Sequence, residues 1–389
     1  MTLQRIPVLP GKPAAPTSCS TLINRKKLTS RLCKVWRYLC LPMVLLTLCL
    51  QTAAATETSE SATGSDERGS YEGAIETEYP DWFKTSFLEL EEDVLEAREA
   101  GKRLMLVFHQ DGCPYCNALI ERNLAQKDIE QTIRDNFDVI EINIWGDLEV
   151  TDMDGAQFTE KSFARQLKVQ FTPTILFYDE AGQFALRLNG YYPPDKFRVA
   201  LDYVVGRHDK KQTFNDYQAE HHRPVGETST TEARPYITGG AADLGRLARE
   251  DKPLLLLFEQ SDCSNCRRLN DEVFSLDETA EYLSGFNVVQ LNMWGKGQTT
   301  GPDNQETTER ELAKSLGVMY APTLVFYASE GTDKQEVIRS ESWFKRFHTQ
   351  SMMDYVLSDQ WKEESNFQRY ISARAETMRE AGVDVNIYD

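Results

Sequence analysis

The sequence predicts an α/β protein with two tandem domains, each built on a mixed central sheet flanked by helices. Two observations support this fold class. First, the chain repeats itself after about 150 residues, because the Cys-x-x-Cys pair Cys113/Cys116 recurs as Cys263/Cys266 in closely similar surroundings. A repeat of this length is too long for a solenoid unit and indicates a duplicated domain. Second, strand and helix patterns alternate within each repeat, as in α/β folds.

The N-terminal region has the pattern of an export signal. Residues 1–37 contain eight basic residues and no acidic one, residues 38–50 are almost wholly apolar, and three alanines end at Ala55. We therefore expect a signal peptide at residues 1–55 that directs the protein to the periplasm and is cleaved after Ala55. The apolar run is short for a membrane span, and an uncleaved anchor is the alternative.

Cleavage at this point would leave cysteine only in the two Cys-x-x-Cys pairs, because the other four cysteines precede Ala55. A chain without further thiols avoids mispairing in an oxidising compartment, which suits a redox protein. Cleavage would also change the formal net charge from −18 to −26, since the removed segment carries eight basic residues and no acidic one. Such acidity argues against binding to nucleic acid or to anionic membranes.

The rest of the chain divides by composition. A stretch rich in Ser, Thr, Glu and Gly predicts a disordered tether, and Asp81–Ala100 then predicts an amphipathic helix. A polar segment between the repeats predicts a linker that packs partly on either domain. The predicted parts are a signal peptide (1–55), a tether (56–80), a first domain (81–206), a linker (207–235), a second domain (236–360) and a C-terminal helical extension (361–389).

Matching runs define the elements inside each repeat, and each set ends with a further strand and a closing helix. The polar segments 147–157 and 296–306 predict surface excursions. The matched elements, first repeat then second, are strands at 103–108 and 253–258, strands at 137–145 and 286–294, helices at 158–169 and 307–318, and strands at 171–178 and 320–327.

Each cysteine pair follows a strand and opens a helix. Backbone N–H groups and the helix dipole at that position favour a thiolate on Cys113, whose sulfur can face solvent. Cys113 can attack a substrate disulfide and Cys116 can resolve the mixed disulfide, or the reverse sequence can oxidise a dithiol. Pro114 suits the first helical turn, where its missing N–H costs nothing.

Two alternatives exist for the cysteine pairs. Zinc sites with four thiolates usually have a second pair nearby, whereas here a whole domain separates the pairs, so we expect no metal and no organic cofactor. A passive structural disulfide is the other alternative, and it stays open for Cys263 and Cys266.

Proline begins a late strand in both repeats, in Thr172-Pro173 and Ala321-Pro322, about 60 residues after the cysteine pair. Proline can stand there simply as a strand-edge residue. Together with the cysteines, the better interpretation is a cis-proline loop that faces the thiols. Such a loop exposes backbone groups that pair with an extended substrate.

On these residues, both repeats resemble thioredoxin-fold domains over roughly 81–206 and 240–360. The first repeat, with its runs GKRLMLVFHQDGCPYC and FTPTILFY, resembles periplasmic thioredoxins of the SoxW-like type. The resemblance implies thiol–disulfide exchange, with Cys113 as the nucleophile and Cys116 as the resolving thiol. It also implies that Thr172-Pro173 is the substrate-facing loop.

Two departures from the thioredoxin pattern concern the chemistry. Val107 and Leu257 stand where thioredoxins carry a buried acid, so proton transfer needs another group, with His109 or water as candidates. In the second repeat, Glu259 replaces His109, and it opposes a thiolate together with Asp262. We therefore expect Cys263/Cys266 to be a weaker or slower redox centre, a relay or a docking module.

The sequence thus predicts an exported thiol–disulfide oxidoreductase that reduces or exchanges disulfides of periplasmic proteins through Cys113 and Cys116. With Thr172 before the loop proline, the chain resembles reductases and isomerases more than strong oxidases. We therefore expect a reductase that a membrane electron donor keeps reduced. The expected partners are disulfide-containing exported proteins. The alternatives are a disulfide isomerase and a thioredoxin-fold binding or chaperone module with structural cysteines.

Overall fold

A computed structural model of the chain describes residues 68–221, 234–301, 305–330 and 333–389. The predicted signal peptide lies outside the described residues. These described residues group into one compact unit. Among the residues described, no helix combines the length and apolar character that crossing a membrane requires.

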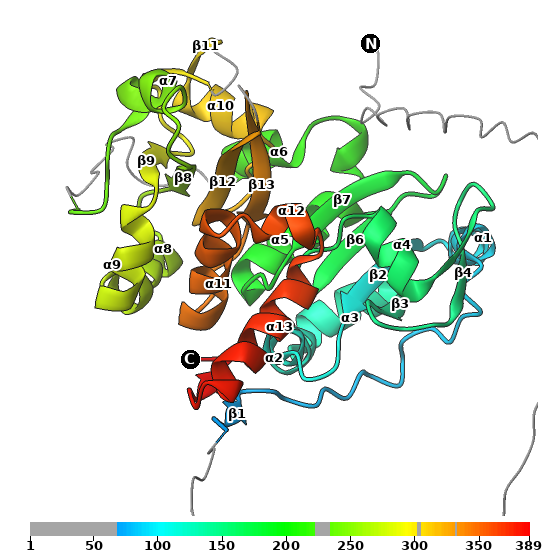
Figure 1. Cartoon of the computed structure of the whole chain (residues 1–389). Helices are drawn as coiled ribbons and strands as arrows, with labels where there is room; N and C mark the ends of the chain where they lie inside the picture. The colour runs from blue at the N-terminus through cyan, green and yellow to red at the C-terminus, as the bar shows by residue number, and fades with distance from the viewer. Residues whose placement is uncertain (1–67, 222–233, 302–304, 331–332) are drawn as a thin grey trace, which may run out of the picture. The chain divides into compact units, whose positions relative to one another are not determined.

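The elements of the first repeat follow the order shown in Figure 1. They are β1 (Tyr71–Glu72), α1 (Leu90–Glu99), β2 (Arg103–His109), α2 (Pro114–Ala118), the π-helical turn η1 (Leu119–Leu124), α3 (Lys127–Asn136), β3 (Phe137–Asn143), β4 (Glu149–Thr151), β5 (Gln157–Thr159), α4 (Glu160–Gln166), β6 (Thr174–Tyr178), β7 (Phe184–Asn189), α5 (Pro194–Val205), the 3₁₀ turn η2 (His208–Lys210) and α6 (Phe214–His221).

The second repeat reproduces this order and then adds the C-terminal helices. Its elements are η3 (Ala241–Asp243), α7 (Leu244–Leu247), β8 (Leu254–Glu259), α8 (Ser264–Arg268), the π-helical turn η4 (Leu269–Phe274), α9 (Asp277–Ser284), β9 (Asn287–Asn292), β10 (Gln298–Thr300), β11 (Glu306–Thr308), α10 (Glu309–Ser315), β12 (Thr323–Glu330), β13 (Asp333–Ser340), α11 (Arg346–Leu357), α12 (Gln360–Glu363), α13 (Phe367–Glu380) and β14 (Val385–Asn386).

Each repeat contains a four-stranded mixed sheet, as the sequence predicts. The strand orders are β3-β2-β6-β7 and β9-β8-β12-β13 (Figure 1). In each sheet the first two strands are parallel, and the last two pair antiparallel. The strand that precedes the cysteine pair, β2 or β8, is therefore central and buried between helices on both faces.

Side chains of the central strands alternate between two cores, because successive residues of a strand point to opposite faces of the sheet. In β2, Met105 and Val107 join one apolar cluster, whereas Leu104, Leu106 and Phe108 join the other. Val107, at the position where thioredoxins carry a buried acid, packs in one of these apolar clusters. Both central strands end beside their cysteine pair and fix its position.

The predicted helix at Asp81–Ala100 begins only at Leu90. Leu88 has a φ of 61°, in the left-handed region, and this conformation cannot continue a right-handed helix. The polar excursions after each Trp-Gly are short antiparallel hairpins, β4–β5 and β10–β11.

The prediction of a disordered tether is wrong for its described part, residues 68–80. There β1 pairs in parallel with β14 at the other end of the chain, and the Gly69 N–H donates to the Arg379 carbonyl at 2.8 Å. Low hydrophobicity suggested disorder, but these backbone hydrogen bonds come from a partner strand more than 300 residues away. Sequence composition alone carries no sign of such a partner.

The segment predicted as a linker is structured at its start and contacts both repeats. In α6, Phe214 and Tyr217 pack into the first-repeat core, and Asn215 donates to the Val318 carbonyl at 2.6 Å. Before it, Asp209 accepts a hydrogen bond from the buried Arg103 guanidinium at 2.8 Å. The side chains of Arg103 and Asp209 are only 4% and 5% exposed, so this ion pair anchors the segment to β2.

We predict that Arg103→Met destabilises the protein by about 3 kcal/mol, because it leaves the buried Asp209 carboxylate without its main partner. The free energy of unfolding from urea titration followed by circular dichroism measures this effect. Arg134→Met is the control, since its partner Glu130 lies on an exposed helix face and such pairs contribute about 0–1 kcal/mol. Equal losses for the two variants would contradict the assigned role of Arg103.

Candidate functional site

Both cysteine pairs occupy the N-terminus of a helix, as the sequence predicts. Cys113 and Cys263 are the N-cap residues of α2 and α8, and each sulfur accepts a hydrogen bond from the N–H of the second cysteine at 3.0 Å. Both pairs are disulfides in this structure. The N–H group and the helix dipole would stabilise a thiolate on the first sulfur of either pair after reduction.

The two predicted proline loops lie against the first cysteine of their own repeat, and both X-Pro bonds are cis. The Cys113 sulfur lies 3.6 Å from the Thr172 carbonyl oxygen and 3.3 Å from the Thr172 hydroxyl. The Cys263 sulfur lies 3.4 Å from the Ala321 carbonyl oxygen. The Thr172 hydroxyl can donate to the Cys113 sulfur, whereas Ala321 offers no such group.

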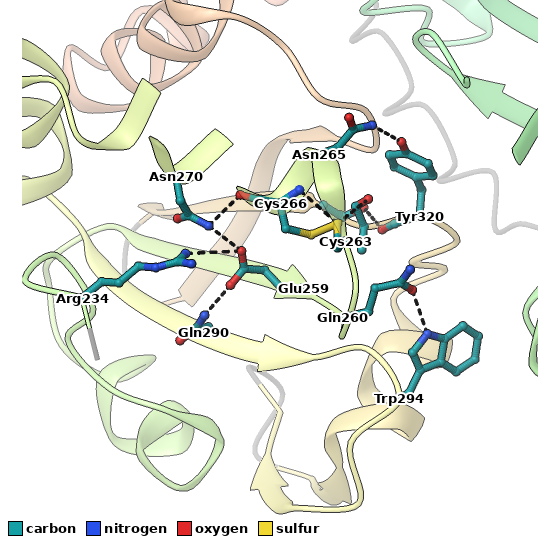
Figure 2. Close-up of a disulfide and its surroundings, with 12 residues drawn as sticks. Arg234, Glu259, Gln260, Cys263, Asn265, Cys266, Asn270, Gln290, Trp294 and Tyr320 are labelled. Atoms are coloured by element: carbon teal, nitrogen blue, oxygen red, sulfur yellow. Dashed lines mark hydrogen bonds and ion pairs between the residues drawn. A yellow bond between two sulfur atoms is a disulfide. The ribbon is translucent and has the colours of Figure 1, made fainter. Parts of the chain in front are cut away.

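Figure 2 shows how the acidic residue of the second site is held. Glu259 accepts hydrogen bonds from the side-chain amides of Asn270, at 2.7 Å, and Gln290, and it pairs with Arg234 at 3.5 Å. The Asn270 amide also donates to the Cys266 carbonyl at 2.7 Å. Arg234 offsets the negative charge that the sequence suggested would oppose a thiolate on Cys263.

A second shared feature lies beside each disulfide. The indole N–H of Trp145 donates to Gln110 at 2.9 Å, and that of Trp294 donates to Gln260 at the same distance. These contacts fix the glutamine that follows each central strand. The duplicated sites therefore keep the same framework, and they differ in what surrounds it.

The second disulfide borders the larger cavity, of about 630 Å³, which we call the Cys263 cleft. Its walls come from both repeats and carry basic, acidic and aromatic side chains. The lining residues used below are Cys263, Asn265, Tyr320, Ala321 and Trp343 from the second repeat, Tyr115, Arg122, Tyr191 and Lys196 from the first, and Tyr388 near the C-terminus. The predicted loop residue Ala321 thus faces a space large enough for a peptide segment.

The first disulfide is largely covered by other parts of the chain, and Cys113 borders a small cavity. Cys113 and Cys116 are 3% and 1% exposed, and Cys263 and Cys266 are 7% and 5% exposed. The Tyr115 ring between them packs edge-on against Phe344, His348 and Tyr388, with ring centroids 5.0, 5.3 and 5.4 Å apart. The Tyr115 hydroxyl also accepts a hydrogen bond from the Lys345 N–H at 3.2 Å.

A small cavity of about 190 Å³ remains beside Cys113. Besides Cys113 and Thr172, it is lined by His348 from α11 and Gln368 from α13. Nothing in the sequence indicated these two residues, because they lie more than 230 positions from Cys113 and belong to the other repeat or to the C-terminal extension. Only the folded chain brings them together.

Two histidines lie near the first site, His109 half-buried and His348 buried. Burial lowers the pKa of His109 to about 4, against the opposing effect of Asp111, and its ring packs 4.5 Å from that of Tyr79. Burial likewise lowers the pKa of His348 to about 4. The Nδ1 atom of His348 is buried and has no hydrogen-bond partner in the described part of the chain. His348 shares the small cavity with Cys113, so it joins His109 as a candidate for proton transfer.

These values predict an acid-dependent loss of stability. The pKa of His348 is about 4 in the folded protein and 6.5 in the unfolded chain, so between pH 6.5 and pH 4 the unfolded chain binds a proton that the folded protein does not. The free energy of unfolding should fall by about 3 kcal/mol over this range from His348 alone. In His348→Gln that part of the loss should vanish.

Urea titrations at pH 7 and at pH 4.5 measure this difference. His221→Gln is the matched control, because His221 is an exposed histidine at the end of α6. If wild type and His348→Gln lost the same free energy on acidification, His348 would not be held neutral by the fold.

The sequence and fold were compared with known proteins. Mouse anterior gradient protein 3 is 26% identical over 113 residues, which cover 27% of this chain, and the chain spans 60% of that relative's length. A thioredoxin-fold protein from Helicobacter pylori covers 35% of this chain and 91% of its own, with 24% identity and a TM-score of 0.28. A thioredoxin from Thermus thermophilus covers 34% and 93%, with 23% identity and a TM-score of 0.24.

The oxidised C-terminal domain of Neisseria meningitidis DsbD covers 32% of this chain and 93% of its own, with 16% identity and a TM-score of 0.23. The family comparison extends further along the chain. The thioredoxin-like domain family matches residues 90–205 and 241–341, which together exceed half of the 389 residues. The chain therefore belongs to the thioredoxin-like domain family, with two thioredoxin-fold domains in tandem.

Proposed function

We propose that the protein is an exported thiol–disulfide oxidoreductase that reduces disulfides of other exported proteins. One observation carries this proposal. In both repeats the first cysteine sulfur accepts an N–H at a helix start and also lies 3.4 to 3.6 Å from the carbonyl that precedes a cis-proline. This geometry stabilises an attacking thiolate and places it beside backbone groups that can hold an extended substrate.

The reaction is an exchange of disulfide bonds. In the reduced protein, the thiolate of Cys113 or Cys263 attacks a substrate disulfide, forms a mixed disulfide and releases one substrate thiolate. Cys116 or Cys266 then attacks the sulfur of its own first cysteine and expels the second substrate thiolate. Two electrons pass to the substrate, and the Cys-x-x-Cys pair becomes a disulfide. A membrane electron donor would return the pair to the dithiol.

The arrangement of the two sites favours an assignment of substrates to the two cysteine pairs that differs from the expected one. Cys113 and Cys116 keep their proposed role as nucleophile and resolving thiol, and Thr172 supports it by offering a hydroxyl to the Cys113 sulfur at 3.3 Å. Cys263 lies at the wider cleft, beside the loop residue Ala321. We therefore assign protein substrates to the second pair, which the sequence suggested was auxiliary.

Export to the periplasm rests on the N-terminal pattern, with its basic segment, apolar run and alanines up to Ala55. The small number of cysteines fits that compartment, because the chain after Ala55 holds only the two exchanging pairs. The proposed partners are therefore disulfide-containing exported proteins.

We predict that the full chain accelerates insulin-disulfide reduction by dithiothreitol and that Cys113→Ser/Cys263→Ser falls to the rate of dithiothreitol alone, because neither repeat retains a nucleophile. Cys263→Ser alone should remove most of the activity and Cys113→Ser less, as only Cys263 lies at the wide cleft. Turbidity from the released insulin chains measures the rate.

Two further variants give a direct readout and a control. Cys266→Ser should accumulate a mixed disulfide with insulin, seen on a non-reducing gel, because its second thiol is missing. Glu281→Gln changes an exposed position of α9 outside the residues that line the cleft and should keep the wild-type rate. A double cysteine variant as active as wild type would instead favour the binding or chaperone alternative.

A further inference from the structure

The two disulfides share one local geometry, and both are buried, but the cavities beside them differ in size. Beside Cys263 the cavity measures about 630 Å³, and beside Cys113 it measures about 190 Å³. The positions that match Tyr115 and Phe171 in the second repeat are Asn265 and Tyr320, and both line the Cys263 cleft. Tyr320 is also buried, because its ring packs 4.9 Å from that of Tyr192 in the first repeat. The difference comes from segments of the same chain that lie over the first site. We call Phe344–His348, α13 and β14 together the cap.

The cap lies over the cis-proline loop of the first repeat. Phe171, next to Thr172, has its ring stacked on Phe344 at 5.0 Å and tilted against Phe367 at 5.4 Å. All three rings are buried. An extended polypeptide paired with this loop would have to occupy the space that these aromatic rings fill.

Hydrogen bonds hold the start of α13 on the same loop. The Phe367 N–H donates to the Gln170 side chain at 2.9 Å, and the Gln368 amide donates to the Gln170 carbonyl at 2.8 Å. The Gln110 amide donates to Gln368 at 3.0 Å. In the second repeat, the matching Gln260 lines the Cys263 cleft, as Gln110 lines the smaller cavity. Polar groups near the first disulfide are therefore hydrogen-bonded to the cap.

The N-terminal strand closes another side of the site. The Ile75 N–H donates to the Gly112 carbonyl, next to Cys113, at 3.3 Å. β1 in turn pairs with β14 of the cap. Both ends of the described chain thus meet over the first disulfide and hold each other in place.

The remaining cavity has the size and chemistry of a small-molecule site. Its volume of about 190 Å³ corresponds to about six water molecules, below the range of drug-sized pockets. Exposed Tyr71, Ala74 and Asp111 line it, which connects it to solvent. The buried Nδ1 of His348, without a partner in the described part of the chain, is a polar group that a ligand can engage.

We propose that the Cys113–Cys116 disulfide exchanges with low-molecular-weight thiols of about the size of cysteine and is closed to folded proteins by the cap. This inference rests on the proposed thiol–disulfide exchange and names the substrate class of its first site. The second disulfide, in the same molecule and with the same local geometry, remains open to proteins.

The exchange balances in atoms and electrons. A small thiolate attacks the Cys113 sulfur, a bond forms between them, and the Cys113–Cys116 bond breaks to leave Cys116 as a thiolate. A second small thiolate attacks the sulfur of the bound small molecule, which releases the small disulfide and leaves Cys113 as a thiolate. Two small thiols are oxidised, and the protein disulfide is reduced with two electrons and two protons.

The test compares two reductants on the full-length oxidised protein, namely free cysteine and a reduced thioredoxin from another source. Samples are quenched with an alkylating agent, and mass spectrometry of the peptides gives the reduction rate of each disulfide. For each disulfide we take the ratio of the thioredoxin rate to the cysteine rate. Intrinsic differences in sulfur reactivity largely cancel in this ratio, so it reports access.

We expect the ratio of the thioredoxin rate to the cysteine rate to be at least about tenfold lower at Cys113–Cys116 than at Cys263–Cys266. The reason is that a protein must dock on the site, whereas cysteine only has to enter it. A smaller difference, or no reduction of the first disulfide by cysteine, would overturn the proposal. If neither reductant acted on either disulfide, the proposed function itself would fail, which is a distinguishable result.

Variants of the cap give a second, independent readout. Gln368→Ala removes the amide contacts to Gln170 and Gln110, and Phe367→Ala removes a ring from over Phe171. Each should raise the ratio at the first disulfide severalfold and leave that at the second unchanged. Phe184→Ala is the control, since Phe184 is exposed on β7. Folded variants, checked by circular dichroism, with wild-type ratios would contradict the role of the cap.

Discussion

The packing of Tyr115 and Phe171 against Phe344 is the interaction on which the rest of the arrangement depends. It places Cys113, Cys116 and the proline loop of the first repeat in the same buried apolar cluster as the helices α11 and α13. The first cysteine pair, which could lie on the surface of the first domain, is thereby packed into the core of the second. The same contacts join the two repeats, cover the first disulfide and leave the second at a cleft with walls from both.

Tyr115 lines the cavities of both disulfides. The residue between the cysteines of the first pair therefore also shapes the site of the second, and Tyr388 shares the wall of the cleft with it. Duplication gave two sites with the same N-cap sulfur, N–H contact and proline loop. The two sites differ in the side chains between and around the cysteines. The Tyr115 ring of the first site packs against the cap, whereas Asn265, at the matching position of the second site, does not.

Much of this could be predicted from the sequence, because it depends on local pattern. Apolar runs such as Leu254–Phe258 predicted central strands, the Cys-x-x-Cys spacing placed Cys113 at a helix start, and Thr172-Pro173 was expected to face it. The cap could not be predicted, because it depends on where the C-terminal helix docks and no periodicity encodes a docking partner. For the same reason, the order of residues 68–80 differs from the predicted tether, because backbone pairing between β1 and β14 leaves no trace in the composition. The covering of Cys113 by the cap likewise could not be predicted.

The most direct measurement of the central claim is the alkylation rate of each first cysteine in the reduced, folded protein, compared for N-ethylmaleimide and for a maleimide carried on a long polymer. If the two sites differ in access as the structure indicates, both reagents label Cys263, whereas only the small reagent labels Cys113 at a comparable rate. Equal labelling of Cys113 and Cys263 by the polymer reagent would contradict the account.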